Sequence, residues 1–192
     1  MKIAIISDIH DNFGNLVKAL KIIKKKKPEQ VVFLGDFCSN GIAKVLANFS
    51  IPIFAIWGNN DGDRTTILKT SLQQGSNLSI GTNIYEVVEF GGRKIFLSHF
   101  HDFARSIAKS GDFDAVFFGH THERFKEFLG DCLLLNPGEL SGHRTGEVGF
   151  AIYDTKMNDV EMIKIDEPIL VKTKETNKYM GEQGIKFRVN KI

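Results

Sequence analysis

The N-terminal part of the chain alternates short apolar runs with stretches of helical periodicity. The apolar runs are typical of buried strands and occupy residues 2–7, 30–34 and 53–57. The expected helices occupy residues 12–26, residues 42–49 and part of 64–74. Strands separated by helices pair in parallel, with the helices packed on the faces of the sheet. The sequence therefore predicts an α/β fold whose ligand sites lie beyond the carboxyl ends of its strands.

After about residue 78 the pattern changes to short strands joined by turn signals. These strands are expected at residues 84–90, 94–98, 115–118, 125–129, 132–135, 149–154 and 160–165. One helix is expected near residues 102–109. The pairs Gly91-Gly92 and Gly130-Asp131 are typical of hairpin turns. The second half thus predicts two sheets packed face to face, with the helices outside.

Composition limits the class of protein. A chain of 192 residues with 42% hydrophobic content can bury one continuous core. The apolar stretches are far shorter than the roughly 20 residues that cross a bilayer, and Ser7-Asp8 interrupts the N-terminal one before a signal peptide could form. Cys38 and Cys132 lie in unrelated segments and are typical of reduced thiols. We therefore expect a cytoplasmic protein without a membrane contact, and the net charge of +2 does not indicate a nucleic-acid partner.

The C-terminal segment differs from the rest of the chain. Residues 1–166 are expected to form the domain, and residues 167–192 a basic C-terminal extension. From Pro168 to Ile192 it has six basic and two acidic residues: Lys172, Lys174, Lys178, Lys186, Arg188, Lys191, Glu175 and Glu182. It is interpreted as a surface extension, with an oligomer contact or a phosphate-attracting arm as alternatives. A homodimer is expected only because dimers are common among soluble proteins.

Five short segments at the ends of strand-like runs carry side chains that can bind metal ions. The chain has six histidines, and five of them lie in these segments. The segments are Asp8-Ile9-His10, Gly35-Asp36, Gly58-Asn59-Asn60-Asp61, His99-Phe100-His101 and Gly119-His120-Thr121-His122. Carboxylate, imidazole and amide oxygen together suit manganese, iron, nickel or zinc better than calcium. Metal chemistry is the first hypothesis, and polar residues that merely cap turns are the alternative.

In this order the segments resemble the calcineurin-like metallophosphoesterase superfamily, whose pattern is D-x-H, GD, GNH, H and GHxH. Over roughly residues 1–165 the chain is most similar to the small YfcE-type phosphodiesterases. The resemblance implies a four-layer α/β/β/α sandwich of two mixed sheets. It also implies two divalent cations per chain, with Mn²⁺ expected ahead of Ni²⁺, Fe²⁺ or Zn²⁺. By position, the first ion would be bound by Asp8, His10, Asp36 and His122, and the second by Asp36, Asn59, His99 and His120.

The chemistry of such a pair of ions points to phosphate esters. Two divalent cations outweigh the charges of Asp8 and Asp36, so a phosphate anion is the natural guest. Paired cations also lower the pKa of a shared water, so that a bridging hydroxide can attack a phosphoryl group in line. The expected function is hydrolysis of a small phosphodiester. The alternatives are a phosphomonoesterase for a small phosphorylated metabolite and a non-catalytic protein-binding scaffold of the same fold.

The chain departs from the superfamily pattern at one position that bears on catalysis. Asn60 stands where many members have a histidine that assists the leaving group, so no imidazole is supplied there. His101, two residues after His99, is the expected substitute, with a supporting role behind the ligands equally open. His101 and Asn60 are therefore the candidate catalytic residues. His143 and Arg144 could reach a phosphate or could be exposed loop residues.

Overall fold

The computed structural model describes residues 1–170. Its elements are β1 (Lys2–Ile6), α1 (Phe13–Lys26), β2 (Gln30–Phe33), α2 (Asn40–Ala47), β3 (Ile53–Ala55), α3 (Arg64–Ser71), β4 (Leu78–Ile80), β5 (Tyr85–Phe90), β6 (Arg93–Ser98), α4 (Ala104–Lys109), β7 (Ala115–Phe117), β8 (Arg124–Leu129), β9 (Cys132–Pro137), β10 (Gly149–Asp154) and β11 (Asp159–Lys164). Each predicted strand and helix is present. Only β4 was not expected, because its sequence Leu78-Ser79-Ile80 has just two apolar residues and lies in no longer apolar run.

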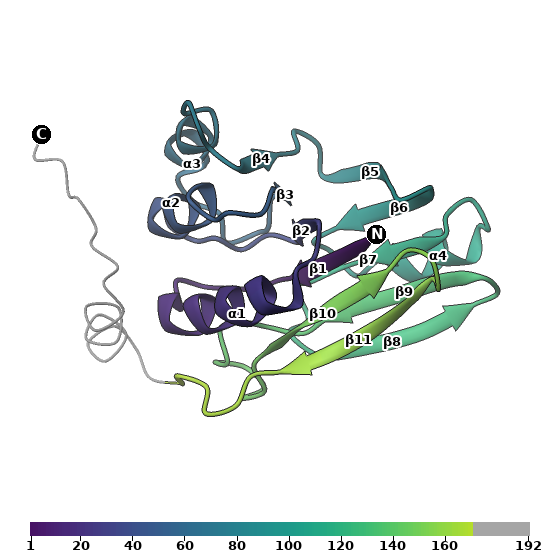
Figure 1. The fold of residues 1–192 in the computed structure, drawn as a ribbon. Coiled ribbons are helices and arrows are strands. Elements are labelled where there is room, and N and C mark those ends of the chain that lie inside the picture. The colour runs from purple at the N-terminus through teal and green to yellow at the C-terminus, as the bar shows by residue number, and fades with distance from the viewer. Residues whose placement is uncertain (171–192) are drawn as a thin grey trace, which may run out of the picture.

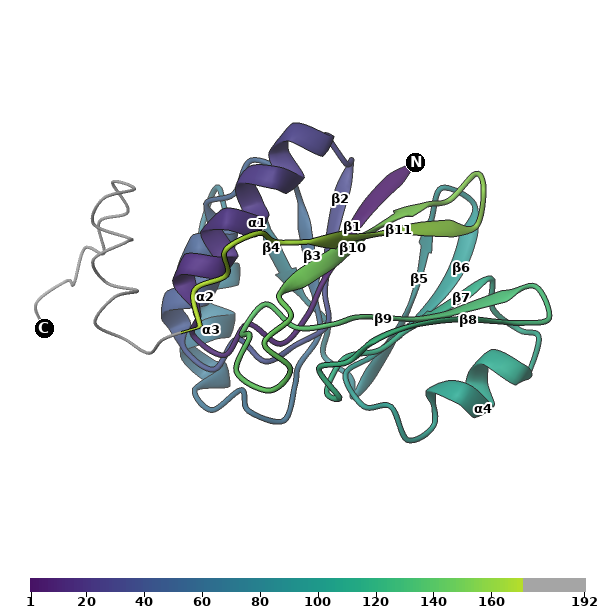
Figure 2. The same cartoon turned by 90° about the horizontal axis from the view of Figure 1, so that it is seen from below.

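The strands form two mixed sheets (Figure 1). The first sheet has the order β11-β10-β1-β2-β3-β4, in which β1 to β4 are parallel and β10 runs antiparallel to β1. The second has the order β5-β6-β7-β9-β8, with β6, β7 and β9 parallel. Figure 2 shows α1, α2 and α3 on one side of the paired sheets and α4 on the other. The predicted four-layer sandwich of two mixed sheets is confirmed.

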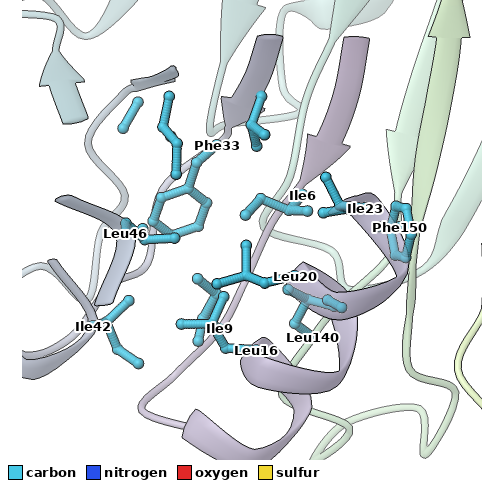
Figure 3. Close-up of a cluster of buried hydrophobic side chains, with 14 of the residues drawn as sticks. Ile6, Ile9, Leu16, Leu20, Ile23, Phe33, Ile42, Leu46, Leu140 and Phe150 are labelled. Carbon is cyan, nitrogen blue, oxygen red and sulfur yellow. The ribbon is translucent and has the colours of Figure 1, made fainter. Parts of the chain in front are cut away.

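The alternation of side chains along β1 explains the layers. Ala4 and Ile6 face the helices, where they belong to a buried cluster with Leu16, Leu20 and Ile23 of α1 (Figure 3). Ile3 and Ile5 belong instead to a second cluster, with Ile95 and Leu97 of β6. A third cluster joins Ala104 and Ala108 of α4 to the outer face of the second sheet. Each sheet is therefore apolar on both faces, as a four-layer fold requires.

The start of the C-terminal extension packs on the first turn of α1. Ile169 donates its backbone N–H to Asn15 Oδ1 at 2.7 Å, and its carbonyl accepts from Asn12 Nδ2 at 2.7 Å. Lys18 Nζ donates to the carbonyl of Glu167. The basic residues of the extension lie outside the described residues. No helix within residues 1–170 combines the length and the apolar character needed to span a bilayer.

Two buried acidic groups, the Tyr153 phenol of β10 and the Cys132 thiol of β9, lie in the second half of the chain. The Tyr153 hydroxyl donates to Asn158 Oδ1 at 2.6 Å, and the Asn158 amide donates to the carbonyls of Asp114 and Asp131. Burial raises the pKa of Tyr153 well above its usual value. Burial, assisted by the Asp114 carboxylate, raises the pKa of the Cys132 thiol to about 11. Both groups therefore ionise more readily in the unfolded chain than in the folded protein.

We expect the free energy of unfolding to fall as the pH rises above about 9, because the unfolded state then loses these protons first. Tyr153→Phe should cost about 1 kcal/mol at pH 7 through the lost hydrogen bond. The difference in the free energy of unfolding between wild type and Tyr153→Phe should shrink by about 1 kcal/mol by pH 11, where an unfolded tyrosine is largely ionised. Urea denaturation at pH 7, 9 and 11 measures this. A difference that stays constant across this range would contradict it.

Candidate metal centre

The five predicted segments meet where the parallel strands of both sheets end. Asp8 follows β1, Asp36 follows β2 and Asn59 follows β3 in the first sheet. His99 follows β6, and the pair His120 and His122 follows β7 in the second. Contacts across the two sheets hold the segments together, since His99 Nδ1 lies 2.7 Å from the Leu34 carbonyl. All seven residues predicted as metal ligands are thus brought to one place, and their role as ligands stays a prediction.

The first cluster forms around His10. Its Nε2 lies 3.2 Å from Asp36 Oδ2 and 3.7 Å from Asp8 Oδ1. His122 Nε2 approaches the same oxygen of Asp8 at 3.4 Å. Asp8, Asp36 and His122 are buried, and His10 is nearly so. The cluster therefore directs two carboxylates and two imidazoles at one small volume.

The atoms of this cluster fit a divalent cation. Within residues 1–170, Asp8 Oδ1 and His10 Nε2 are among the buried side-chain atoms that have no hydrogen-bond partner, an unfavourable state that a cation would relieve. Burial lowers the pKa of His10, but its contacts with Asp36 and Asp8 outweigh this and raise the pKa to about 11. Burial alone would raise the pKa of Asp36, yet His10, His99 and Asn60 hold it well below its usual range. The volume is therefore one in which positive charge is stabilised.

The second cluster forms around Asn59. Its Oδ1 lies 2.9 Å from His99 Nε2 and 2.8 Å from His120 Nδ1. Because the Leu34 carbonyl can only accept, His99 Nδ1 carries the hydrogen and Nε2 presents its lone pair. Asp36 Oδ2 lies 3.6 Å from that Nε2. The second cluster thus also gathers acceptor atoms that a cation would hold together.

The backbone around both clusters is unusual. Five predicted ligands have left-handed φ angles, a backbone conformation that residues other than glycine rarely adopt. They are Asp8 (52°), His10 (44°), Asp36 (66°), His120 (68°) and His122 (66°). The segments also approach one another closely. A Cβ atom added at Gly58 would lie 2.1 Å from Asp36 Oδ1, and one at Gly119 would lie 2.2 Å from Ser7 Oγ. The glycines that precede Asn59 and His120 are therefore required by packing.

Comparison with known proteins identifies the family of the chain. Residues 1–158 match the model of the calcineurin-like phosphoesterase superfamily domain. The chain belongs to this superfamily. Phosphodiesterase MJ0936 of Methanocaldococcus jannaschii is 38% identical over 168 residues, which cover 86% of this chain and 100% of the relative.

Two solved structures agree with this assignment. One, described as a novel archaeal phosphodiesterase, has a TM-score of 0.78 at 36% identity and covers 86% of this chain and 100% of its own. The YfcE phosphoesterase of E. coli has a TM-score of 0.68 over 90% of this chain and 97% of its own. At 21% identity, the likeness to YfcE shows the shared fold.

Glu139 contacts the predicted ligand His122, a contact that the sequence did not reveal. His122 Nδ1 donates to its Oε2 at 2.6 Å, which turns His122 Nε2 toward Asp8. Thr145 donates to its Oε1 through the backbone N–H at 2.7 Å, and the Ser141 hydroxyl donates to its Oε2. Burial alone would raise the pKa of Glu139, but the hydrogen bonds from His122, Ser141 and Thr145 hold it well below its usual range. A carboxylate behind a histidine in this way fixes the ring for metal binding.

We expect Glu139→Gln to weaken binding of the first ion by roughly 10- to 100-fold, as loss of an outer carboxylate partner typically does. A glutamine amide can donate to His122 Nδ1, which would leave the hydrogen on the nitrogen that faces Asp8. Calorimetric titration of metal-stripped protein with Mn²⁺ or Zn²⁺ measures the change. Glu147→Gln is the matched control, because Glu147 is exposed and contacts Lys164. Equal affinity in Glu139→Gln and wild type would contradict the role of Glu139.

Asp61 and Cys38 also support the ligand loops. Asp61 Oδ2 accepts from the Gly58 N–H at 2.6 Å and from the Asp36 N–H at 3.3 Å, while Oδ1 accepts from the Cys38 N–H at 3.1 Å. Burial raises the pKa of Asp61. Cys38 Sγ lies 3.5 Å from His10 Nδ1, so this thiol contacts a predicted ligand. One buried carboxylate therefore joins the loops after β2 and β3.

The two candidate catalytic residues occupy different positions. Asn60 donates its backbone N–H to Asp36 Oδ1 at 2.8 Å and its side-chain amide to Asp36 Oδ2 at 2.9 Å. His101 is exposed at the rim of the centre, and its ring stacks on that of His120 with 5.6 Å between centroids. Asn60 therefore contacts both oxygens of a predicted ligand, while His101 faces solvent beside another.

Proposed function

We propose that this protein hydrolyses a phosphodiester with two divalent cations held at the strand ends. Asp8, His10 and His122 would bind the first ion, Asn59, His99 and His120 the second, and Asp36 would bind both. The observation that carries the proposal is the position of Asp36 Oδ2, which lies 3.2 Å from His10 Nε2 and 3.6 Å from His99 Nε2. One carboxylate oxygen thus lies between the two clusters, where a ligand shared by two ions is needed.

The residues of the chain would prepare this centre for the reaction. When bound, the cations would lower the pKa of a water and polarise the phosphoryl oxygens. Asn60 would hold the Asp36 carboxylate in its shared position through two hydrogen bonds. The Leu34 carbonyl and Glu139 would orient His99 and His122, so that their Nε2 atoms present lone pairs. These contacts fix the geometry before substrate arrives, which is the main contribution of protein groups to such sites.

His101 is the group proposed to assist the leaving oxygen. Asn60 donates to Asp36 through its backbone N–H and through its side-chain amide, so Asn60 would act through that carboxylate as a positioning residue. His101 has an exposed imidazole beside His120, from which a proton could pass to a departing alkoxide.

The engagement of three arginines, Arg64, Arg105 and Arg124, favours a diester over a monoester. A phosphomonoester carries about one more negative charge near neutral pH, and sites for it commonly offer arginine forks. Arg64 donates to the Gly58 carbonyl at 2.9 Å and lies over the Trp57 ring. Arg105 is paired with Glu127, and Arg124 donates to the Ile163 carbonyl at 2.7 Å. All three are held by other protein groups, which supports a substrate of lower charge.

Hydrolysis of an aryl phosphodiester and of the matching monoester tests the proposal. Metal-stripped protein is reloaded with Mn²⁺, Ni²⁺ or Zn²⁺, and both the bound ions and the turnover are measured. Metal-dependent turnover that is faster for the diester is the expected result. Two bound ions without turnover of either ester would favour the scaffold alternative. Manganese as the resident ion, a cytoplasmic location and a homodimer stay predictions.

A further inference from the structure

His143 lies against the first cluster, although the superfamily pattern does not include it. It belongs to the loop between β9 and β10, four residues after Glu139. Its ring meets that of His10 edge-on, with 4.7 Å between centroids, and lies 5.1 Å from that of His122. The side chain is exposed, whereas His122 is buried. His143 therefore covers the first cluster from the solvent side.

The separation of the ring nitrogens is close to what a shared ion requires. One ligating nitrogen from each of His10, His122 and His143 can be chosen so that all three lie within 4.8 Å of one another. Three nitrogens on one ion, each with a bond of about 2.1 Å, can all be at most about 3.6 Å from one another. The separations of the three nitrogens thus need to shrink by up to about 1.5 Å, a movement that an exposed side chain can make.

The loop that carries His143 is anchored to the same carboxylate that orients His122. The backbone N–H groups of Arg144 and Thr145 donate to Glu139 Oε1 at 3.2 and 2.7 Å. On the other side of His143, Gly142 has a left-handed φ of 69°, and a Cβ atom there would lie 2.6 Å from Val148 Cγ2. The position of the His143 backbone is therefore set by contacts on both sides.

We propose that His143 is an additional ligand of the first ion, which would then have three imidazoles together with Asp8 and Asp36. This inference rests on the metal centre of the proposed function. It distinguishes the two ions, because the second would have two imidazoles, one amide oxygen and the shared carboxylate. Nitrogen ligands favour zinc and nickel, whereas carboxylate and water favour manganese. His143 would thus raise the preference of the first ion for zinc or nickel over manganese.

Metal titration of three variants tests this role. His143→Phe keeps a ring of similar size without nitrogen, His143→Asp replaces imidazole by carboxylate, and Arg144→Ala is the matched control in the same loop. His143→Phe should bind the first Zn²⁺ at least about tenfold more weakly and Mn²⁺ with a smaller change. His143→Asp should shift the preference toward Mn²⁺. Because the His143 side chain is exposed, the thermal stability of the metal-free variants should match that of wild type.

The outcomes separate this inference from the function on which it rests. If wild type binds two ions and His143→Phe binds the first Zn²⁺ equally tightly, the ligand role of His143 is wrong and the proposed centre stands. If wild type binds no ion, the proposed metal centre and the ligand role of His143 are both wrong. Visible spectra of the Co²⁺-loaded proteins give a second readout, since removal of one nitrogen ligand should change the absorption of the first ion. Identical spectra in wild type and His143→Phe would overturn the inference.

Discussion

Asp36→Asn should lower the turnover of a phosphodiester by roughly 10³-fold or more. The substitution preserves the size of the side chain but removes the charge that would be shared by both ions. Loss of about 4 kcal/mol of stabilisation in the transition state corresponds to roughly a 10³-fold loss of rate, and each ion is worth several kcal/mol. The amide of the new asparagine is also a donor, and it would face one of the two N–H groups of Asn60 that now donate to Asp36, so one hydrogen bond would be lost. Turnover with saturating Mn²⁺, together with the metal content, measures the effect.

Asp11→Asn is the matched control for this variant. Asp11 is exposed in the same group of loops and also has a left-handed φ of 56°, a conformation that asparagine tolerates. Its carboxylate accepts from the Ser39 hydroxyl at 2.5 Å. Turnover in Asp11→Asn should therefore stay close to that of wild type. Asp36→Asn with turnover within tenfold of the control would contradict a shared role for Asp36.

Gly58→Ala should disrupt the centre without removing any ligand. The added methyl group would lie 2.1 Å from Asp36 Oδ1 and 2.5 Å from the Asp36 backbone nitrogen, so the carboxylate and its loop must both move. Overpacking of this kind typically costs about 1–3 kcal/mol of stability. Displacement of Asp36 by about 1 Å should lower turnover by roughly 100-fold. Urea denaturation and diester turnover measure the two effects.

Gly62→Ala provides the comparison, because no atom lies within 4 Å of a Cβ added there. This variant should unfold within about 0.5 kcal/mol of wild type and retain its turnover. Gly58 and Gly62 lie in the same loop, so a general sensitivity of the loop to alanine would affect both variants. Full activity of Gly58→Ala would show that the close approach to Asp36 is not required.

The predictable part of the molecule is the part encoded by local pattern. The βα alternation gave the parallel strands, and the order of the short motifs gave seven residues that the fold brings together. Glu139 could not be found in this way, and His143 was named only as a residue that could reach a phosphate, because each is a single residue in a long loop. They reach the centre only because β10 pairs with β1, which lets Leu140 and Ser141 donate their N–H groups to the Asp8 carbonyl at 3.2 and 2.9 Å. That contact joins residues far apart in the sequence, so no local sequence pattern predicts it.

Asn60 shows a different limit. Its sequence position suggests a place facing substrate, since other members have histidine there. Its backbone N–H and its side-chain amide instead donate to Asp36, because the turn after β3 folds back over that carboxylate. Hydrogen-bond direction of this kind depends on side-chain torsions and on the approach of two loops, and neither can be read from a motif.

The left-handed backbone of the five predicted ligands lowers the stability of the fold at the residues on which activity is proposed to depend. Strain of this kind typically costs about 1 kcal/mol or more at each residue other than glycine. Glycine at such a position, above all at the partly exposed His120, would relieve strain and remove a ligand in the same step. A search for heat-resistant variants that scored folding alone should therefore collect inactive proteins altered in these loops. Selection for thermal stability in this protein should therefore include a parallel selection for turnover.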